Sequence, residues 1–410
     1  MSESKEKVPK IRFPGFTDAW EQRALGKMGD TFTGLSGKAK EDFGHGDAKF
    51  VTYVNVFSNA ISNPNGVESV EIDDKQKQVK YGDVFFTTSS ETPEEVGMSS
   101  VWLENTKNVY LNSFCFGYRP TVEFDPYYLA FMLRSSLIRE KFMFLAQGVS
   151  RYNISKNKVM EMKVPVPKLN EQRKVGAFFA CLDHLITLHQ RKLNNLKNLK
   201  AGLFQKMFPK NGEDFPEVRF PGFTDAWEQR KLGEIYTERK ERGYDSLQIL
   251  SVSIHHGVSN EELDSDNLGK KVRRSEDKSL YKQVHFGDLV LNMMRAWQGA
   301  IGVVKSEGMV SPAYITAIPS AELYPLFMDY CLRRDEAIIQ MDNLSYGVTD
   351  FRKRLYWDSF INVLCRIPSV PEQERITAFF TNLDHLITLH QRKLKHLQEQ
   401  KKALQQQMFV

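Results

Sequence analysis

The sequence predicts an α+β protein made of two tandem α/β units, each followed by a long helix, with the two helices paired as an antiparallel coiled coil of pseudo-twofold symmetry. Three observations predict this fold. One block of sequence is repeated near the start of each half, a second block is repeated near the end of each half, and apolar residues around the second block recur every 3.5 residues on average. That spacing, when sustained, indicates a coiled-coil seam.

Length and composition exclude several classes of protein. The 410 residues exceed one ordinary domain and suit two or three. Apolar residues make up 41% and charged residues 26%, a globular profile rather than a disordered one. No apolar stretch approaches the roughly 18 residues of a membrane span, and the polar first ten residues do not resemble a signal peptide. Four scattered cysteines without a CxxC pair fit free thiols, so we expect a cytoplasmic protein without a membrane partner.

The two repeated blocks define the domain boundaries. Residues 12–26 read RFPGFTDAWEQRALG and residues 219–233 read RFPGFTDAWEQRKLG, identical at 14 of 15 positions. The second block, LDHLITLHQRKL, is unchanged at 182–193 and 383–394. The separations of 207 and 201 residues are similar, so each unit occupies about half of the chain. We predict α/β domains over residues 12–168 and 219–368, and long helices over 169–210 and 369–410.

The expected elements follow the same order in both units. A Gly-Asp turn leads into an apolar strand in VKYGDVFF (79–86) and again in VHFGDLVL (284–291). Asp125-Pro126 starts a helical stretch that reaches about Gln147, and Tyr324-Pro325 starts its counterpart. A short strand that ends in prolines closes each unit, at Met162 to Pro167 and at Phe360 to Pro368.

The predicted coiled-coil seam contains equivalent residues of both helices. Each helix has about 38 residues and would be ~57 Å long. Because each helix follows its own unit, pseudo-twofold symmetry makes the pair antiparallel, and polar seam residues would fix its register at some loss of stability. The alternative is that each helix only lines the core of its own domain. The seam residues are Leu182, Ile186, His189, Leu193 and Leu196, with Leu383, Ile387, His390, Leu394 and Leu397.

Sequence motifs of catalysis are incomplete. GLSGK (34–38) lacks the spacing of a phosphate-binding loop. DPYY (125–128) resembles the Asp/Asn-Pro-Pro-aromatic motif of amino-group methyltransferases, but it lacks the second proline and suits a helix cap better. His184 and His189 are five residues apart on a helix and point in different directions, and His255-His256 has no nearby ligand partner. We therefore expect no catalytic residue and no metal site in this chain.

Basic and hydrogen-bonding residues gather in comparable loops of the two units. The chain has 56 basic and 51 acidic residues, and this net charge of +5 permits a polyanionic partner without requiring one. Arginine and lysine neutralise phosphates, while arginine, asparagine and glutamine read base edges. One basic loop alone is more often plain surface, but matching positions in both units favour DNA contact. The candidate DNA-binding residues are Ser89, Ser90, Thr92, Ser150, Arg151, Tyr152, Asn153 and Lys156 in the first unit, and Arg295, Trp297, Gln298, Arg352, Lys353 and Arg354 in the second.

The near-identity of the repeated blocks contrasts with the divergence of the sequence between them. The simplest explanation is that both copies bind the same partner, so that two copies of one protein dock on the chain. A recent duplication with unequal drift is the alternative.

The motifs together resemble the specificity subunit of type I restriction-modification systems. The resemblance rests on FPGFTDAWEQRxLG, the Gly-Asp strand, the Pro-x-x-x-Glu-Gln start of the long helix and LDHLITLHQRKL. The Pro-x-x-x-Glu-Gln motif lies at Pro167 to Gln172 and at Pro368 to Gln373. The order of motifs is matched twice and covers nearly the whole chain. LNMMRAWQGAIG (291–302) is also similar to one version of the target-recognition domain of that family.

The resemblance implies a non-catalytic subunit with two target-recognition domains, each reading one half of a bipartite site in double-stranded DNA. The two helices would set the distance between the half-sites and dock two methyltransferase subunits. S-adenosylmethionine, ATP and Mg would be bound only by partner subunits, namely the methyltransferases and two restriction (motor-nuclease) subunits. Two other functions stay open: a single-chain DNA methyltransferase or nuclease with an unrecognised active site, and a purely protein-binding coiled-coil scaffold.

Overall fold

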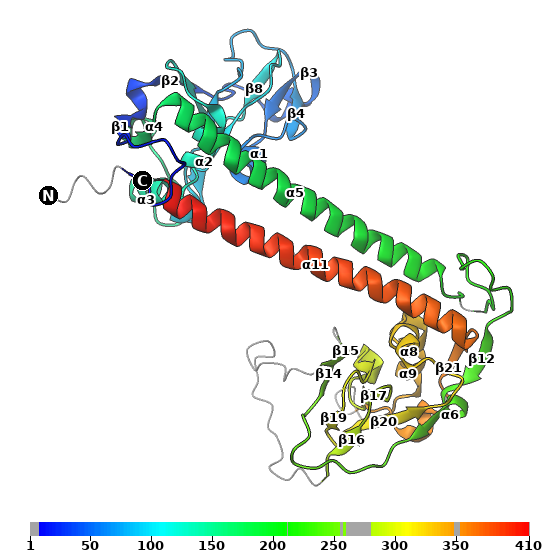
Figure 1. The fold of residues 1–410 in the computed structure, drawn as a ribbon. Helices are drawn as coiled ribbons and strands as arrows, with labels where there is room; N and C mark the ends of the chain where they lie inside the picture. The colour runs from blue at the N-terminus through cyan, green and yellow to red at the C-terminus, as the bar shows by residue number, and fades with distance from the viewer. Residues whose placement is uncertain (1–7, 211, 255–256, 260–279, 348–352, 410) are drawn as a thin grey trace. The chain divides into compact units, whose positions relative to one another are not determined.

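The structure is a computed structural model that describes residues 8–210, 212–254, 257–259, 280–347 and 353–409. The chain forms two compact units: unit 1 comprises Met1–Lys192 and His390–Val410, and unit 2 comprises Leu193–Leu389. Two long helices, α5 (Leu169–Lys206) and α11 (Val370–Met408), each contribute one segment to each unit (Figure 1). Their lengths of 38 and 39 residues agree with the predicted helices.

Unit 1 is built on a four-stranded antiparallel sheet with the order β2-β9-β5-β7 and a three-stranded sheet with the order β4-β3-β8. The two-stranded pairs β1-β11 and β6-β10 complete it. The strands are β1 (Glu21–Ala24), β2 (Gly29–Thr33), β3 (Phe43–Val51), β4 (Val67–Val70), β5 (Val84–Thr87), β6 (Ser89–Ser90), β7 (Ser99–Val101), β8 (Val109–Leu111), β9 (Cys115–Pro120), β10 (Tyr152–Asn153) and β11 (Lys163–Val166). The shorter helices are α1 (Tyr53–Ser58), α2 (Pro126–Met132), α3 (Ser136–Leu145) and α4 (Lys156–Glu161).

The described residues of unit 2 form a four-stranded antiparallel sheet with the order β13-β20-β17-β18 and three two-stranded pairs, β12-β21, β14-β15 and β16-β19. The strands are β12 (Glu228–Lys231), β13 (Tyr236–Glu238), β14 (Ser251–Ser253), β15 (Gly257–Ser259), β16 (Lys282–Val284), β17 (Leu289–Asn292), β18 (Ile301–Val303), β19 (Gly308–Val310), β20 (Tyr314–Pro319) and β21 (Leu364–Ile367). The shorter helices are α6 (Leu232–Ile235), α8 (Pro325–Cys331), α9 (Asp335–Leu344) and α10 (Trp357–Phe360). The predicted α+β class is confirmed in both units.

The Gly-Asp turns lead into the central strands β5 and β17, as the sequence predicts. Gly82 and Gly287 have φ angles of +83° and +92°, a backbone conformation that glycine adopts without strain. The aspartate that follows each glycine is buried. Asp83 accepts a hydrogen bond from the backbone N–H of Lys80 at 2.7 Å and is held by Arg119.

The helical stretch predicted from Asp125 to about Gln147 is two helices in the structure. Helix α2 ends at Met132 and α3 begins at Ser136, because Ser135 adopts an extended conformation with φ of −65° and ψ of 151°. The counterpart in unit 2 is divided in the same way, into α8 and α9. Both α2 and α8 have proline in the first turn, where its missing N–H has no acceptor to lose.

The ends of the two long helices close the hydrophobic cores. Met408 and Phe409, at the end of α11, belong to the core of unit 1 together with Trp20 and Phe179. The Phe409 ring stacks on Phe179 at a centroid distance of 5.4 Å. In unit 2, Met207 and Phe208 at the end of α5 are buried in the core in the same way.

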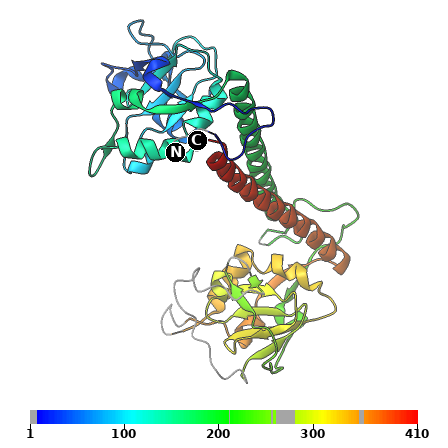
Figure 2. The same cartoon turned by 60° about the vertical axis from the view of Figure 1, so that its left-hand side comes forward.

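The equivalent ring in unit 2, Phe208, stacks on Phe327 at a centroid distance of 5.7 Å and meets Trp227 edge-on at the same distance. The backbone on either side repeats as well. Ile11 donates an N–H to the carbonyl of Gln407 at 3.1 Å in unit 1, and Val218 donates to the carbonyl of Lys206 at 2.9 Å in unit 2. The two ends of the described chain therefore lie side by side in unit 1 (Figure 2).

The helix segments pair in antiparallel directions within each unit. In unit 1, His189 contacts His390 and Asp183 forms an ion pair with Lys401 at 2.5 Å. In unit 2, Lys200 forms the equivalent ion pair with Asp384. All ten predicted seam residues are buried or half-buried. Among the described residues, no helix is both long and apolar enough to span a membrane.

We predict that Phe409→Ala and Phe208→Ala destabilise different units. Each removes a buried ring, for which about 3–5 kcal/mol is typical, so Phe409→Ala loosens unit 1 and Phe208→Ala loosens unit 2. Hydrogen exchange measured by mass spectrometry on the full chain localises each loss of protection. Leu199→Ala, at a half-exposed side chain, is the matched control and leaves both units protected. An equal loss in both units for either phenylalanine variant would contradict the prediction.

Candidate nucleic-acid interface

The first repeated block packs against the start of the long helix that follows it. In unit 1, Arg12 donates from Nε and Nη2 to the two carboxylate oxygens of Glu171, at 2.6 and 2.8 Å. Arg219 and Glu372 repeat this pair in unit 2 at 2.7 Å for both bonds. The side chains of both glutamates are nearly fully buried, so each needs its arginine for charge compensation.

The glutamine that follows each glutamate fixes the helix start to the preceding loop. Gln172 donates from Nε2 to the carbonyl of Pro167 at 2.8 Å, and its Oε1 accepts the backbone N–H of Asp125 at 3.1 Å. Gln373 makes the same two kinds of bond in unit 2. The Pro-x-x-x-Glu-Gln motif therefore holds α2 or α8 against the long helix.

The DPYY segment is part of this framework through its aspartate and its second tyrosine. Asp125 is the N-cap of α2 and accepts the backbone N–H of Tyr128 at 2.8 Å. Tyr128 is fully buried and donates its hydroxyl to the carbonyl of Pro165. The interpretation of this segment as a helix cap is confirmed. Within the described part of the chain, no cluster of three or more His, Cys, Asp or Glu is placed to hold a metal ion.

The two candidate loops of unit 1 lie against each other. Strand β10 pairs with β6, so Tyr152 is opposite Ser90 and Asn153 is opposite Ser89. The Arg151 guanidinium donates to the Ser89 hydroxyl at 3.2 Å. The structure thus joins loops that are about 60 residues apart in the sequence.

The side chains of these loops differ in their access to solvent. Ser89 and Ser90 are buried, and Ser90 bonds to Glu95, which also accepts from Thr92. The two serines therefore support the loop rather than face a ligand. The exposed candidates are Thr92, Ser150, Arg151 and Asn153, and the half-buried ones are Tyr152 and Lys156.

The candidate loops of unit 2 also meet. The backbone of Leu355 donates to the carbonyl of Met293 at 2.9 Å, and Lys353 lies over the ring of Trp297 at 5.5 Å from the centroid. Arg295, Gln298 and Arg354 are exposed, whereas Trp297 and Lys353 are half-buried. Arg352 lies outside the described residues.

Several residues that support these loops were not found from the sequence. Tyr53 donates its hydroxyl to the carbonyl of Ser89 at 2.7 Å in unit 1. In unit 2, Asp342 forms an ion pair with Lys353, and Tyr346 packs on Tyr356 at 4.9 Å between ring centroids. No local pattern marks these residues, because each contact joins separate elements. The two sequence loops of each unit are nevertheless brought together into one surface.

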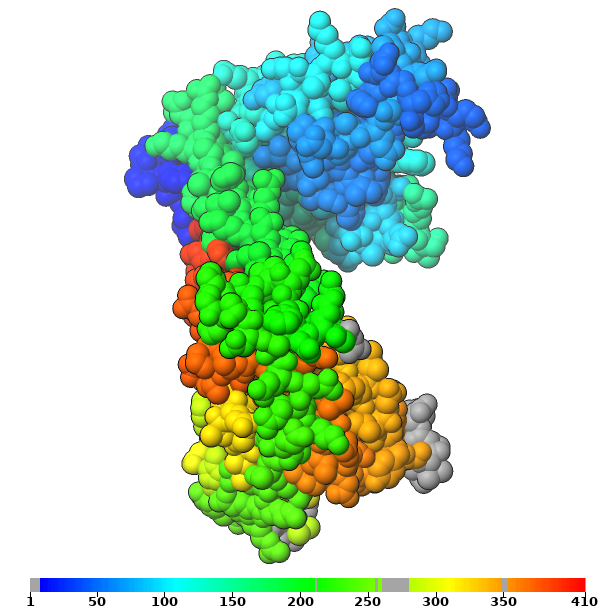
Figure 3. All heavy atoms as spheres, turned by 90° about the vertical axis from the view of Figure 1, so that its right-hand side faces the viewer, coloured from blue at the N-terminus to red at the C-terminus, as the bar shows by residue number. Residues whose placement is uncertain are grey.

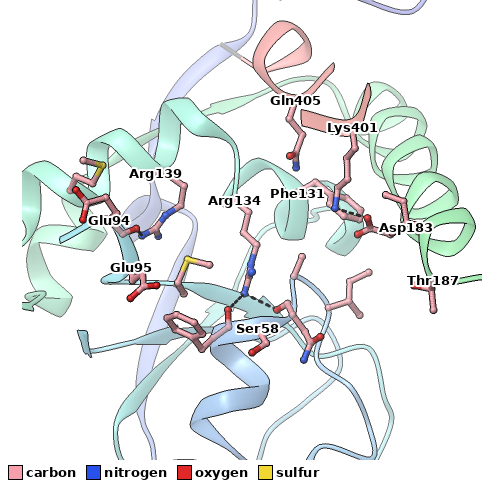
Figure 4. A pocket seen from close by; sticks show the side chains of 17 residues that line it. Ser58, Glu94, Glu95, Phe131, Arg134, Arg139, Asp183, Thr187, Lys401 and Gln405 are labelled. Atoms are coloured by element: carbon pink, nitrogen blue, oxygen red, sulfur yellow. Dashed lines mark hydrogen bonds and ion pairs between the residues drawn. The ribbon is translucent and has the colours of Figure 1, made fainter. Parts of the chain in front are cut away.

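A groove in unit 1 does not favour a polyanion. It has a volume of about 780 Å³ and is lined by three basic side chains (Arg134, Arg139, Lys401) and three acidic ones (Glu94, Glu95, Asp183). Figure 4 shows Lys401 paired with Asp183 at one side of the groove. Burial lowers the pKa of Arg134 and Arg139 to about 10, and both donate to backbone carbonyls. These arginines are structural, so the candidate loops are the better nucleic-acid surface.

The second repeated block has an exposed apolar side as well as its seam. Leu185 and Leu188 of α5 are 37% and 39% exposed, and the equivalent Leu386 and Leu389 of α11 are 40% and 52% exposed. The long helices present solvent-facing side chains on the face shown in Figure 3. The same pair of leucines is therefore available in each unit.

Comparisons with known proteins agree with one another. The family model described as type I restriction modification DNA specificity domain matches residues 17–198. Two relatives from Methanocaldococcus jannaschii are each 23% identical: the MjaX specificity subunit over 239 residues (56% of this chain, 55% of the relative) and the MjaVIII specificity subunit over 307 residues (68% of both). The chain thus aligns with just over half the length of the first relative.

One solved structure has a similar fold over the whole length. It is the S subunit of a type I restriction-modification system from M. genitalium, with a TM-score of 0.59 and 14% identity. The alignment covers 98% of this chain and 99% of that one. At this identity the similarity concerns the fold alone.

We predict that Arg295→Ala weakens binding of the chain to duplex DNA. Arg295 is exposed on the candidate loop of unit 2, so its guanidinium is free to reach a phosphate or a base edge. If it contacts a phosphate, affinity falls equally on all sequences and the salt slope decreases by about 1; if it contacts a base, about 1–3 kcal/mol is lost at one position. Fluorescence anisotropy titrations over a range of salt concentrations distinguish the two. Lys240→Ala, a basic exposed residue outside the loops, is the control, and an equal loss from it would contradict the prediction.

Proposed function

Because the chain belongs to the specificity-subunit family of type I restriction-modification systems, we propose that it reads a bipartite site in double-stranded DNA and docks two methyltransferase subunits. The observation that carries the proposal is the contrast between repeated and divergent surfaces. The framework contacts and the exposed leucines are the same in both units, whereas the candidate loops differ in residue type. Binding of the same partner at two places requires repeated surfaces, and reading of two different half-sites requires divergent ones.

The candidate loops support reading of unlike half-sites. Unit 1 presents Arg151 and Asn153, with Glu91 and Thr92 exposed beside them. Unit 2 presents Arg295, Gln298 and Arg354. Arginine pairs with guanine and amide side chains pair with adenine in the major groove, so the two sets suit different base sequences.

The proposed subunit is non-catalytic. S-adenosylmethionine would be bound by the methyltransferase partners, and ATP and Mg by two restriction subunits that complete the complex. The DPYY segment, which resembles a methyltransferase motif, has its aspartate and second tyrosine engaged in capping and packing. A scaffold that binds proteins alone would leave the matched polar loops of both units without a role.

The DNA-reading proposal is tested with two single substitutions in the complex with the methyltransferase. We expect Asn153→Ala to relax base discrimination in one half-site only and Gln298→Ala to relax it in the other, with about 1–3 kcal/mol lost at a contacted base. Sequencing of methylated DNA from cells that express each variant, together with footprints of the purified complexes, measures the effect. A single continuous footprint without two half-sites would contradict the proposal.

The docking proposal is tested by stoichiometry. Leu185→Asp with Leu188→Asp places charges in the exposed apolar pair of α5, so we expect the chain to bind one methyltransferase subunit instead of two. Adding Leu386→Asp and Leu389→Asp should reduce this number to none. Native mass spectrometry counts the subunits directly. Leu199→Asp, on α5 but outside the repeated block, is the control that keeps two. Two subunits bound to the four-substitution variant would overturn this docking site.

A further inference from the structure

The two histidines of the coiled-coil seam contact each other in unit 1. His189 of α5 and His390 of α11 have their Nδ1 atoms 2.9 Å apart, with ring centroids at 5.1 Å and an interplanar angle of 49°. They are the same residue of the repeated block, eight positions into LDHLITLHQRKL. Both are half-buried, so the contact is shielded from water on part of its surface. Because the two facing residues are identical, the side chain must be able both to donate and to accept a hydrogen bond.

The short Nδ1 to Nδ1 distance fixes how many protons the pair can hold. A hydrogen bond between the two nitrogens requires a proton on one Nδ1 and a lone pair on the other. The neutral pair meets this condition when one ring is the Nδ1–H tautomer and the other is the Nε2–H tautomer. A third proton, on the free Nε2 of the donor ring, keeps the bond and adds one charge. A fourth proton occupies both Nδ1 atoms, which then repel each other.

The charges around the pair oppose protonation. Burial, the facing His390 ring, and Lys192 and Lys393 together lower the pKa of His189 below its ordinary value of 6.5. Lys192 lies on α5 and Lys393 on α11, so both helices contribute a positive charge. Asp183, a carboxylate of the same segment of α5, is occupied by Lys401. The same two lysines also oppose a divalent metal ion, so the pair suits a shared proton better than a cation.

We propose that the hydrogen bond between His189 and His390 makes the packing of the C-terminal arm against the rest of unit 1 sensitive to acid. The C-terminal arm is residues 390–409, which pair with α5 and end in the buried Phe409. Release of the arm breaks the hydrogen bond between the rings and removes the burial that lowers the pKa of His189, so His189 takes up a proton more readily. Acid therefore favours the released arm, and it opens the core of unit 1 at Trp20 and Phe179, the rings that Phe409 contacts.

The direction of the pH dependence follows from the lowered pKa of His189. With the arm released, His189 binds a proton near its ordinary pKa of 6.5, and with the arm docked the lowered pKa of His189 means that it binds the proton only at lower pH. Docking is therefore fully stable above about pH 6.5 and weakens as the pH falls below it. One extra proton taken up on release changes the equilibrium by at most about tenfold per pH unit.

The experiment compares protection factors of the arm at pH 7.5 and pH 5.5 by hydrogen exchange of the full chain, corrected for intrinsic exchange rates. We expect the protection of wild-type residues 395–409 to fall at the lower pH, by up to about tenfold for one proton taken up on release. The variant His189→Asn with His390→Asn keeps a self-complementary amide pair, as asparagine does at seam positions of coiled coils, and should lose the pH dependence while the arm stays docked. Lys192→Gln with Lys393→Gln should reduce the pH dependence, because the pKa of His189 rises toward that of the free ring.

A matched control keeps the test specific. His184→Asn with His385→Asn removes two exposed histidines of the same repeated block and should behave as wild type. Wild-type pH dependence in the His189→Asn/His390→Asn variant would overturn the proposal. Increased protection of the wild-type arm by Zn²⁺ that the same variant lacks would also overturn it, because the pair would then be a metal site.

Discussion

The fold depends on burial of the Met-Phe pair that ends each long helix. Helix α5 follows the strands of unit 1, and its Met207 and Phe208 complete the core of unit 2. Helix α11 follows the strands of unit 2, and its Met408 and Phe409 complete the core of unit 1. Neither core is closed by the half of the sequence that supplies its sheets. The antiparallel pairing of helix segments is the geometric condition for this exchange, and the Lys-Asp ion pairs of the seam stabilise it in both units.

The near-identity of the repeated blocks has two separate physical causes. Arg12, Phe13 and Trp20 of the first block make internal contacts that their counterparts repeat, such as the edge-on packing of Phe13 on Phe178 at 5.8 Å and of Phe220 on Phe379 at 5.7 Å. Those contacts preserve the block without any partner. The leucines of the second block are each more than a third exposed, so internal packing explains their repetition less well, and they support the proposed docking more strongly than the first block does.

Local patterns in the sequence predicted the elements and long-range contacts determined what those elements present. Turn glycines, helix-starting prolines and the spacing of 3.5 residues are local, and they located β5, β17, α2, α8 and both long helices. The burial of Ser89 was not predictable, because it results from pairing of β6 with a strand 60 residues away. The partner of the buried aspartate was not predictable either. Arg119 of β9 holds Asp83, whereas in unit 2 Arg239, which directly follows β13, holds Asp288.

Because the two turn aspartates are held by arginines from different places in the sheet, the interiors of the two units can differ in their packing. The same buried aspartate accepts a guanidinium from two different places in the sheet, so the turn tolerates a rearranged interior as long as one arginine reaches it. The contacts that attach each sheet to the helices come instead from the borders of the unit, at Arg12, Glu171 and Gln172 and at their copies. The interior between these borders can therefore be exchanged as one piece. Recombination between the repeats would exchange that interior in one event and keep the border contacts that attach it to the helices.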